Sequence, residues 1–157
     1  MDKFQITKQG YEKLKAEVEK LKNVERPNII KQIAAARELG DLKENAEYHS
    51  AKDKQGFIEA QIADLEARFL RAEIVDVSKL SGTKVKFGAT VTLENLDNGK
   101  KVTYKIVSDF EADIDEGLIS SVSPVGRALI NKEVGDELEI STPGGVMNYE
   151  ILEVKFI

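Results

Sequence analysis

Cysteine is absent from this 157-residue chain, histidine occurs once, proline three times, and there is no long apolar run. Without cysteine, the chain forms neither a disulfide framework nor a thiolate nucleophile. No apolar stretch approaches the roughly 18 residues of a membrane-spanning helix. The opening MDKFQITKQGYEKL also lacks the apolar core of a signal peptide. We therefore expect a cytoplasmic protein with no membrane partner.

An excess of basic charge is also missing. Residues 1–75 contain 14 basic and 14 acidic residues, whereas residues 76–157 contain 9 and 14, so the net charge of -5 lies in the C-terminal half. This balance argues against a domain that binds duplex DNA through a broad basic face, although it allows local basic contacts. The apolar fraction of 41% is typical of a folded protein, and the length suits one domain or two small ones.

The first half of the chain has the apolar spacing of two long helices. Thr7 is expected to be the N-cap of the first helix, and the second should run from about Glu44 to Glu73. Apolar residues recur three and four positions apart in both helices: Leu14, Val18, Leu21, Ile29 and Ile33 in the first, and Ile58, Ile62, Leu65 and Phe69 in the second.

Gly40 is the only strong breaker between these helices, so a short connection must fold them back antiparallel. Pro27 predicts a kink or short break near Arg26, because proline lacks a backbone donor and crowds the preceding turn. About 30 residues at a rise of 1.5 Å give each helix a length of roughly 45 Å. We expect an extended coiled-coil arm over residues 1–77, with its tip at residues 39–46.

After residue 73 the apolar period changes to two, as in strands. Two β-hairpins are indicated, ATVTLENL-DNGK-KVTYKIV (89–107) and DELEIST-PGG-VMNYEILEVKF (136–156). A further strand is expected at EIVDV (73–77), and a short helix near Pro124 within SPVGRALINK (123–132). Residues 78–157 should form a small, mostly antiparallel α+β domain.

The tip segment LGDLKEN (39–45) allows two interpretations. In one, Gly40 ends the first helix, Asp41 is the N-cap of the second, and Glu44 completes a capping box. In the other, Asp41 and Glu44 lie on one helical face and approach the same hard cation. Two carboxylates alone make an unfinished Mg²⁺ site, so the tip would complete a site held by another molecule. The spacing alone favours capping.

Longer segments resemble one family. GDLKENAEYHSAKDKQGF (40–57) is similar to the tip of the bacterial transcript-cleavage (Gre) factors of the A type. Further segments resemble the same family in the same order: RPNIIKQIAAARELGDLKENAEYHSAK (26–52), FGATVTLENLD (87–97), EADIDEGLIS (111–120), SPVGRALINKEVGDE (123–137) and TPGG (142–145). The likeness covers essentially the whole chain, and it changes the preferred interpretation of Asp41 and Glu44 from capping to function.

The resemblance implies an antiparallel coiled-coil hairpin followed by an FK506-binding-protein-like domain, with bacterial RNA polymerase as the partner. The arm would enter the secondary channel of the polymerase and approach the extruded RNA 3′ end of a backtracked complex. There Asp41 and Glu44 would help to hold Mg²⁺ shared with the polymerase and orient the attacking water. The protein would be a monomer without a tightly bound cofactor. It would stimulate cleavage by the polymerase, rescuing arrested complexes, rather than act as an enzyme.

Other tip residues receive roles from the same resemblance. Arg37 and Lys52 would face the RNA phosphates, although ordinary charge pairing on a solvated arm is the alternative. Lys52 stands where relatives commonly have arginine, and lysine does not make the planar two-point phosphate contact. Four residues would shape the tip: Leu42, Lys43, Asn45 and Tyr48. Packing across the hairpin is the alternative for Leu42 and Tyr48.

In the second half, the resemblance implies docking on the rim of the polymerase channel through Ser123, Pro124, Val125, Gly126 and Arg127. A short packing helix is the alternative role for this segment, and Asn131 stands where relatives often have glycine. The acidic segment SDFEADIDEG (108–117) is not an EF-hand, because Ile114 replaces the turn glycine and Ser120 the bidentate glutamate. His49, the only histidine, is expected to be an exposed helix residue.

Two rival functions remain open. A coiled-coil protein could occupy the polymerase channel without promoting cleavage, although the presence of both Asp41 and Glu44 counts against it. A prolyl isomerase with a helical arm is the other rival, although the aromatic residues of the C-terminal half are too few and scattered to indicate a lined pocket. A shared fold would not by itself imply isomerase activity.

Overall fold

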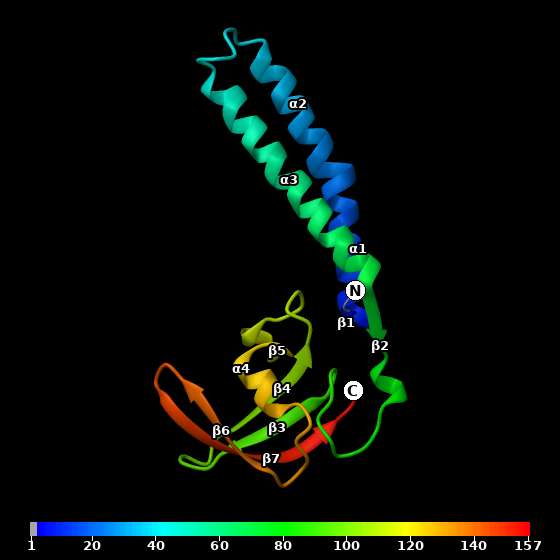
Figure 1. The fold of residues 1–157 in the computed structure, drawn as a ribbon, viewed down its shortest axis with the longest axis vertical. Coiled ribbons are helices and arrows are strands. Elements are labelled where there is room, and N and C mark those ends of the chain that lie inside the picture. The colour runs from blue at the N-terminus through cyan, green and yellow to red at the C-terminus, as the bar shows by residue number, and fades with distance from the viewer. Residues whose placement is uncertain (1–2) are drawn as a thin grey trace. The chain divides into compact units, whose positions relative to one another are not determined.

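A computed structural model describes residues 3–157, which divide into two compact units. One unit comprises Tyr11–Ala72, and the other combines Lys3–Gly10 with Glu73–Ile157 (Figure 1). The division into folding domains after residue 77 remains a prediction, because compactness does not measure independent folding. No helix within residues 3–157 is both long enough and apolar enough to cross a membrane.

The helical unit is the predicted antiparallel hairpin. Helix α1 (Lys8–Lys20) continues through a π-helical turn (Leu21–Glu25) into α2 (Arg26–Arg37), and α3 (Ala46–Arg71) returns beside them (Figure 1). The helix is not broken near Arg26 as predicted. A π-helical turn instead precedes Pro27, and its extra residue accommodates a ring that lacks an N–H. Helix α3 has 26 residues, so it is about 39 Å long.

The hairpin core follows the predicted apolar seam. Its buried residues are Leu21, Ile29, Ala51, Ile58 and Ile62, and Ile33 and Leu65 pack against them. Nearer the base, the rings of Tyr11 and Phe69 stack with centroids 5.0 Å apart. The second helix begins at Ala46 rather than near Glu44 as predicted, and it ends at Arg71 rather than at residue 73.

A two-stranded sheet is formed by the strands that precede α1 and follow α3 in the chain. Its strands are β1 (Phe4–Thr7) and β2 (Ala72–Val75), which are distant in sequence. The sequence predicted β2 in part and missed β1, because four residues carry almost no periodicity and pair only through the folded chain. Thr7 is the N-cap predicted for α1: its Oγ1 accepts a hydrogen bond from the N–H of Gly10 at 3.1 Å.

The globular unit contains a five-stranded sheet in the order β5-β4-β3-β7-β6. Both predicted hairpins are present: β3 (Thr90–Asn95) with β4 (Lys101–Val107), and β6 (Glu137–Thr142) with β7 (Gly145–Lys155). Strand β5 (Leu118–Ser120) pairs parallel to β4, which the sequence did not indicate. The short helix α4 (Pro124–Leu129) completes the predicted α+β architecture of a helical hairpin and an FK506-binding-protein-like domain.

Candidate functional site

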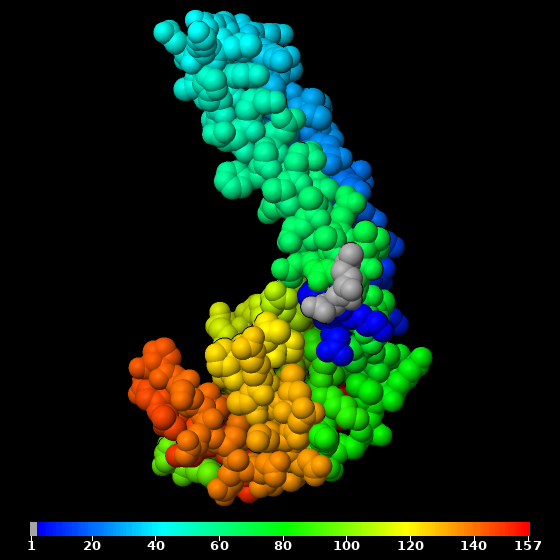
Figure 2. Space-filling model, in the orientation of Figure 1, coloured from blue at the N-terminus to red at the C-terminus, as the bar shows by residue number. Residues whose placement is uncertain are grey.

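The connection between α2 and α3 forms the solvent-facing end of the hairpin, drawn in cyan in Figure 2. Helix α2 ends at Arg37, and Gly40 follows with a φ of 120°, a value that side-chain-bearing residues rarely adopt. Residues 41–45 then form a non-helical turn before α3 begins at Ala46. Gly40 therefore has the predicted chain-reversing role.

Asn45 is the N-cap of α3. Its Oδ1 accepts a hydrogen bond from the N–H of Tyr48 at 3.0 Å, while its Nδ2 donates to the carbonyl of Ala36 at 2.5 Å. One side chain thus starts α3 and ties it to the last turn of α2. The predicted capping box is wrong, because Asn45 occupies the position assigned to Asp41, and Glu44 precedes the helix.

Neither of the two tip carboxylates, Asp41 and Glu44, therefore caps α3. Asp41 Oδ1 accepts a hydrogen bond from the N–H of Lys43 at 3.0 Å, which stabilises the turn locally. Glu44 has no hydrogen-bonding or ion-pair partner among residues 3–157, and both side chains are exposed. The premise that they share a helical face is also wrong, because residues 41–44 are not helical.

These carboxylates could contribute oxygen ligands to Mg²⁺ but could not complete its shell. Carboxylate oxygens suit a hard cation, and Asp41 retains an oxygen that bonds no group within residues 3–157. Within the described residues, no cluster of three or more histidine, cysteine or acidic side chains is placed to hold a metal ion. The donor set fits a shared magnesium site only if another molecule supplies the remaining ligands.

The other predicted tip residues differ in the contacts that they make. The guanidinium of Arg37 lies 5.9 Å from the ring centroid of the half-buried Tyr48, so these two residues are brought together across the hairpin. Leu42 is 41% exposed, and Lys43 is also exposed, so neither packs into the hairpin core. Lys52 donates from Nζ to Oε1 of Gln55 at 3.1 Å, within α3.

His49 has a local structural role. Its Nε2 lies 3.1 Å from the carbonyl oxygen of Lys43, and its exposed ring meets that of Tyr48 edge to face at 5.7 Å. The histidine therefore supports the turn that carries Asp41 and Glu44. The sequence predicted its exposure but gave no sign of the contact with Lys43, which depends on the shape of the turn.

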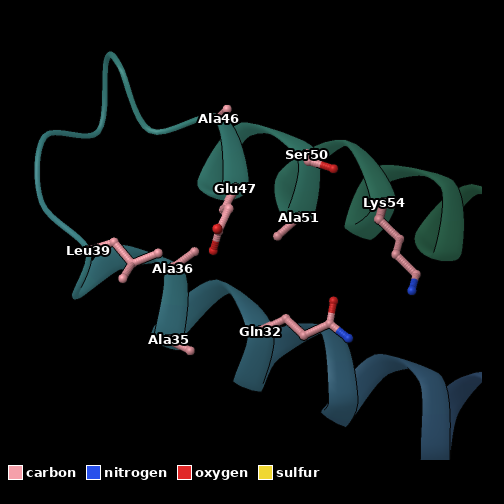
Figure 3. Close-up of a pocket in the computed structure, with 9 residues that line it drawn as sticks. All are labelled: Gln32, Ala35, Ala36, Leu39, Ala46, Glu47, Ser50, Ala51 and Lys54. Carbon is pink, nitrogen blue, oxygen red and sulfur yellow. The ribbon is translucent and has the colours of Figure 1, made fainter.

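A groove below the tip was not predicted from the sequence. It lies between α2 and α3, has a volume of about 610 Å³, and is flanked by alanines that leave space between the helices (Figure 3). Leu39, Glu47 and Lys54 also line it. The run of alanines at 34–36 was the available signal, but alanine by itself indicates only a strong helix former.

The predicted docking segment surrounds the start of α4. Ser123 Oγ donates to the Ser120 carbonyl at 2.6 Å and accepts from the N–H of Gly126 at 3.1 Å, so it is the N-cap. Pro124 and Arg127 are exposed, Val125 is half-buried, and Gly126 is buried. Gly126 is therefore packed against the chain's own backbone, and its docking role stays a prediction.

Asn131, which follows α4, has a backbone conformation that is typical of glycine. This residue has a φ of 72°, in the left-handed region that glycine commonly occupies. Asparagine tolerates this conformation better than most residues with a side chain. The substitution of glycine by asparagine is therefore compatible with the local turn.

Two family models together match nearly all of the chain. The model described as "Transcription elongation factor, N-terminal" matches residues 4–74, and "Transcription elongation factor, GreA/GreB, C-term" matches residues 80–156. A transcription elongation factor GreA of Thioalkalivibrio sulfidiphilus is 56% identical over the full length of both chains. The GreA of Caulobacter vibrioides is 53% identical, also over both full lengths.

Two solved structures are also similar to this chain. GreA factor homolog 1 of Thermus thermophilus is 30% identical and has a TM-score of 0.44, with 97% of this chain and 98% of that chain covered. A GreA/GreB elongation factor from Nitrosomonas europaea is 26% identical and has a TM-score of 0.45, with 98% and 100% covered.

Proposed function

Because the chain belongs to the GreA/GreB family of transcription elongation factors, we propose that it rescues arrested bacterial RNA polymerase by stimulating transcript cleavage. Its hairpin enters the secondary channel of a backtracked polymerase and brings the tip to the extruded RNA 3′ end. The observation that carries this proposal is the exposure of Asp41 and Glu44, neither of which caps a helix. Since the partner is a cytoplasmic enzyme, we propose that the protein acts in the cytoplasm.

Asp41 and Glu44 supply oxygens at a site otherwise built by the polymerase. The hydrogen bond from Lys43 orients the Asp41 carboxylate while leaving its second oxygen available to a ligand or an attacking water. Glu44 has no partner among the described residues and can accept a hydrogen bond from the same water. When bound, shared Mg²⁺ lowers the pKa of water and stabilises charge on the phosphate. These roles give water a defined direction of approach.

We propose that the protein is not itself a nuclease. Its one histidine contacts the Lys43 carbonyl, and the tip carboxylates form only part of a metal-binding set. The scissile phosphate and the remaining ligands therefore belong to the polymerase complex. In this division of labour, the protein improves the position and charge environment of water, and the polymerase holds the RNA.

Basic tip residues and α4 have supporting roles in the proposal. The Arg37 guanidinium, placed over Tyr48, and the exposed Lys52 provide local positive charge for the extruded RNA. The exposed Pro124 and Arg127 at α4 dock on the rim of the polymerase channel. The Ser123 cap holds this surface in shape.

The decisive experiment uses a stalled, backtracked bacterial elongation complex with 3′-labelled RNA and Mg²⁺. Wild-type protein should release short 3′ fragments, whereas Asp41→Asn and Glu44→Gln should bind the polymerase but release few. Glu38→Gln is the matched control, because it removes an exposed acid just before the tip. Protein and Mg²⁺ without polymerase should leave the RNA intact.

The outcomes separate the rival functions. Binding by the wild-type protein without any fragment release would identify a channel occupant and overturn the cleavage proposal. Full cleavage by both variants would remove Asp41 and Glu44 from the mechanism. Cutting of free RNA would instead identify a nuclease.

A further inference from the structure

A buried carboxylate holds the first turn of α1 within the globular unit. Glu111 lies between β4 and β5, and it is only 8% exposed. It accepts hydrogen bonds from the backbone N–H of Thr7 at 3.2 Å and from the Thr7 hydroxyl. It also accepts bonds from Ser108, at 3.2 Å from the N–H and 2.8 Å from the hydroxyl. The N-cap of α1 is therefore attached to a loop of the sheet domain.

The hydrogen bonds satisfy Glu111 without a cation. It forms no ion pair within residues 3–157, so four donors compensate for burial of the carboxylate. No buried side-chain nitrogen or oxygen in the described chain lacks a partner. An apolar replacement would leave the N–H groups of Thr7 and Ser108 without this acceptor.

Gly10 makes room for the carboxylate. A Cβ atom at Gly10 would lie 2.1 Å from Cδ of Glu111, a distance that excludes any side chain while Glu111 keeps its place. Glycine is a poor helix former, yet Gly10 lies in the first turn of α1. The helix start and the loop therefore form one fitted junction of Thr7, Gly10, Ser108 and Glu111, which we name the base clamp.

The base clamp lies on one of the two chain connections between the compact units. From Gly10, α1 and α2 lead to the tip, and α3 returns the chain to β2. We propose that Glu111 is a positioning residue for the tip. By fixing the start of α1, Glu111 limits where Asp41 and Glu44 can lie once the globular unit has docked. This role rests on the proposed cleavage function, because tip placement affects cleavage rather than docking.

The cleavage test compares Glu111→Gln and Glu111→Ala with Glu116→Gln, an exposed acid in the same loop. At saturating protein, we expect Glu111→Ala to lower the maximal cleavage rate by about tenfold or more, since small displacements of positioned groups have large effects on rate. The concentration for half-maximal cleavage should change less than about twofold, a factor equivalent to about 0.4 kcal/mol. Glu111→Gln retains the shape and one acceptor, so its loss should be intermediate.

A second measurement, made without polymerase, tests whether Glu111 restricts motion at the base clamp. Because the chain has no cysteine, Asp53→Cys and Lys132→Cys provide two unique positions for spin labels. The distance distribution should be narrow in the wild-type background and in Glu116→Gln, and broad in Glu111→Ala. Circular dichroism would verify that the labelled proteins are folded.

A double substitution tests the fit itself. Gly10→Ala should lower the melting temperature of the wild-type protein, because its Cβ displaces Glu111. In the Glu111→Ala background the same substitution should raise the melting temperature, because the collision is gone and alanine favours the helix. Lowering in both backgrounds would overturn the fitted junction.

The cleavage outcomes distinguish this inference from the proposed function. Fragment release by the wild-type protein, with equal maximal rates for Glu111→Ala, would overturn the positioning role alone. No release by the wild-type protein would overturn the proposed function and the positioning role together. A lowered maximal rate with an unchanged narrow label distribution would also contradict the positioning role, because the clamp would not restrict the junction.

Discussion

Arg26 and Glu59 form a bidentate ion pair across the hairpin. Arg26 Nε lies 2.7 Å from Glu59 Oε1, and Nη2 lies 2.8 Å from Oε2. This fork joins the start of α2 to the middle of α3, immediately after the π-helical turn. The hydrogen bond from Arg26 lowers the pKa of the Glu59 carboxyl below its usual range, and the same bond raises the pKa of Arg26.

The ion pair predicts a specific acid dependence. A carboxyl whose pKa is lower in the folded state stabilises the fold above its unfolded pKa of about 4.3, and this contribution disappears as the pH falls through the folded value. The melting temperature of Glu59→Gln should therefore be slightly below that of the wild-type protein at pH 7, and the difference should vanish in acid. A constant difference from pH 7 to strong acid would contradict the role of charge. The exposed pair should contribute little in either case.

The N-cap assignment predicts unequal effects of substitution at the tip. Asn45→Ala should lower the free energy of unfolding by about 1 kcal/mol, because it removes the cap and the bond to Ala36. Asp41→Ala should change it by less than about 0.5 kcal/mol, because Asp41 only supports an exposed turn. Denaturant unfolding of both variants measures the contrast. A larger loss for Asp41→Ala would restore Asp41 as the cap.

The tip carboxylates predict a shift in magnesium dependence. If Asp41 contributes an oxygen ligand, Asp41→Asn should raise the Mg²⁺ concentration for half-maximal cleavage by about tenfold, equivalent to about 1.4 kcal/mol. Excess Mg²⁺ should restore part of the lost rate. The measurement is a Mg²⁺ titration of fragment release, with Glu38→Gln as the control. An unchanged midpoint with a lowered plateau would limit Asp41 to orienting water.

Two helical glycines should respond in opposite directions to alanine. A Cβ at Gly126 would lie 2.1 Å from the backbone oxygen of Ser120, so Gly126→Ala should destabilise the protein by about 1–3 kcal/mol. Gly56 lies in α3 with no atom within 4 Å of a Cβ at that position. Gly56→Ala should stabilise the protein by about 0.5–1 kcal/mol. Equal effects, measured by denaturant unfolding, would contradict the packing described for α4.

The periodic parts of the fold were predictable because local chemistry determines them. Leu21, Ile29, Ile58 and Ile62 recur at helical spacing, and each has to be covered by the opposite helix. Strand β3 alternates half-buried and buried residues, with Val91 and Leu93 in the core, as its period of two indicated. Gly40, with its positive φ, marked the reversal between the helices.

The tertiary structure decided the features that depend on residues distant in sequence. Asn45 became the cap because its side chain also reaches Ala36 on the other helix, a contact invisible to the Asp-x-x-Glu pattern. In the sequence, Glu111 is one acid among several in residues 108–117, and only folding brings it against Thr7 and Gly10. Sequence determines local periods and turn preferences by itself. Which polar group satisfies which buried partner is a long-range question, since burial and hydrogen bonding depend on the whole fold.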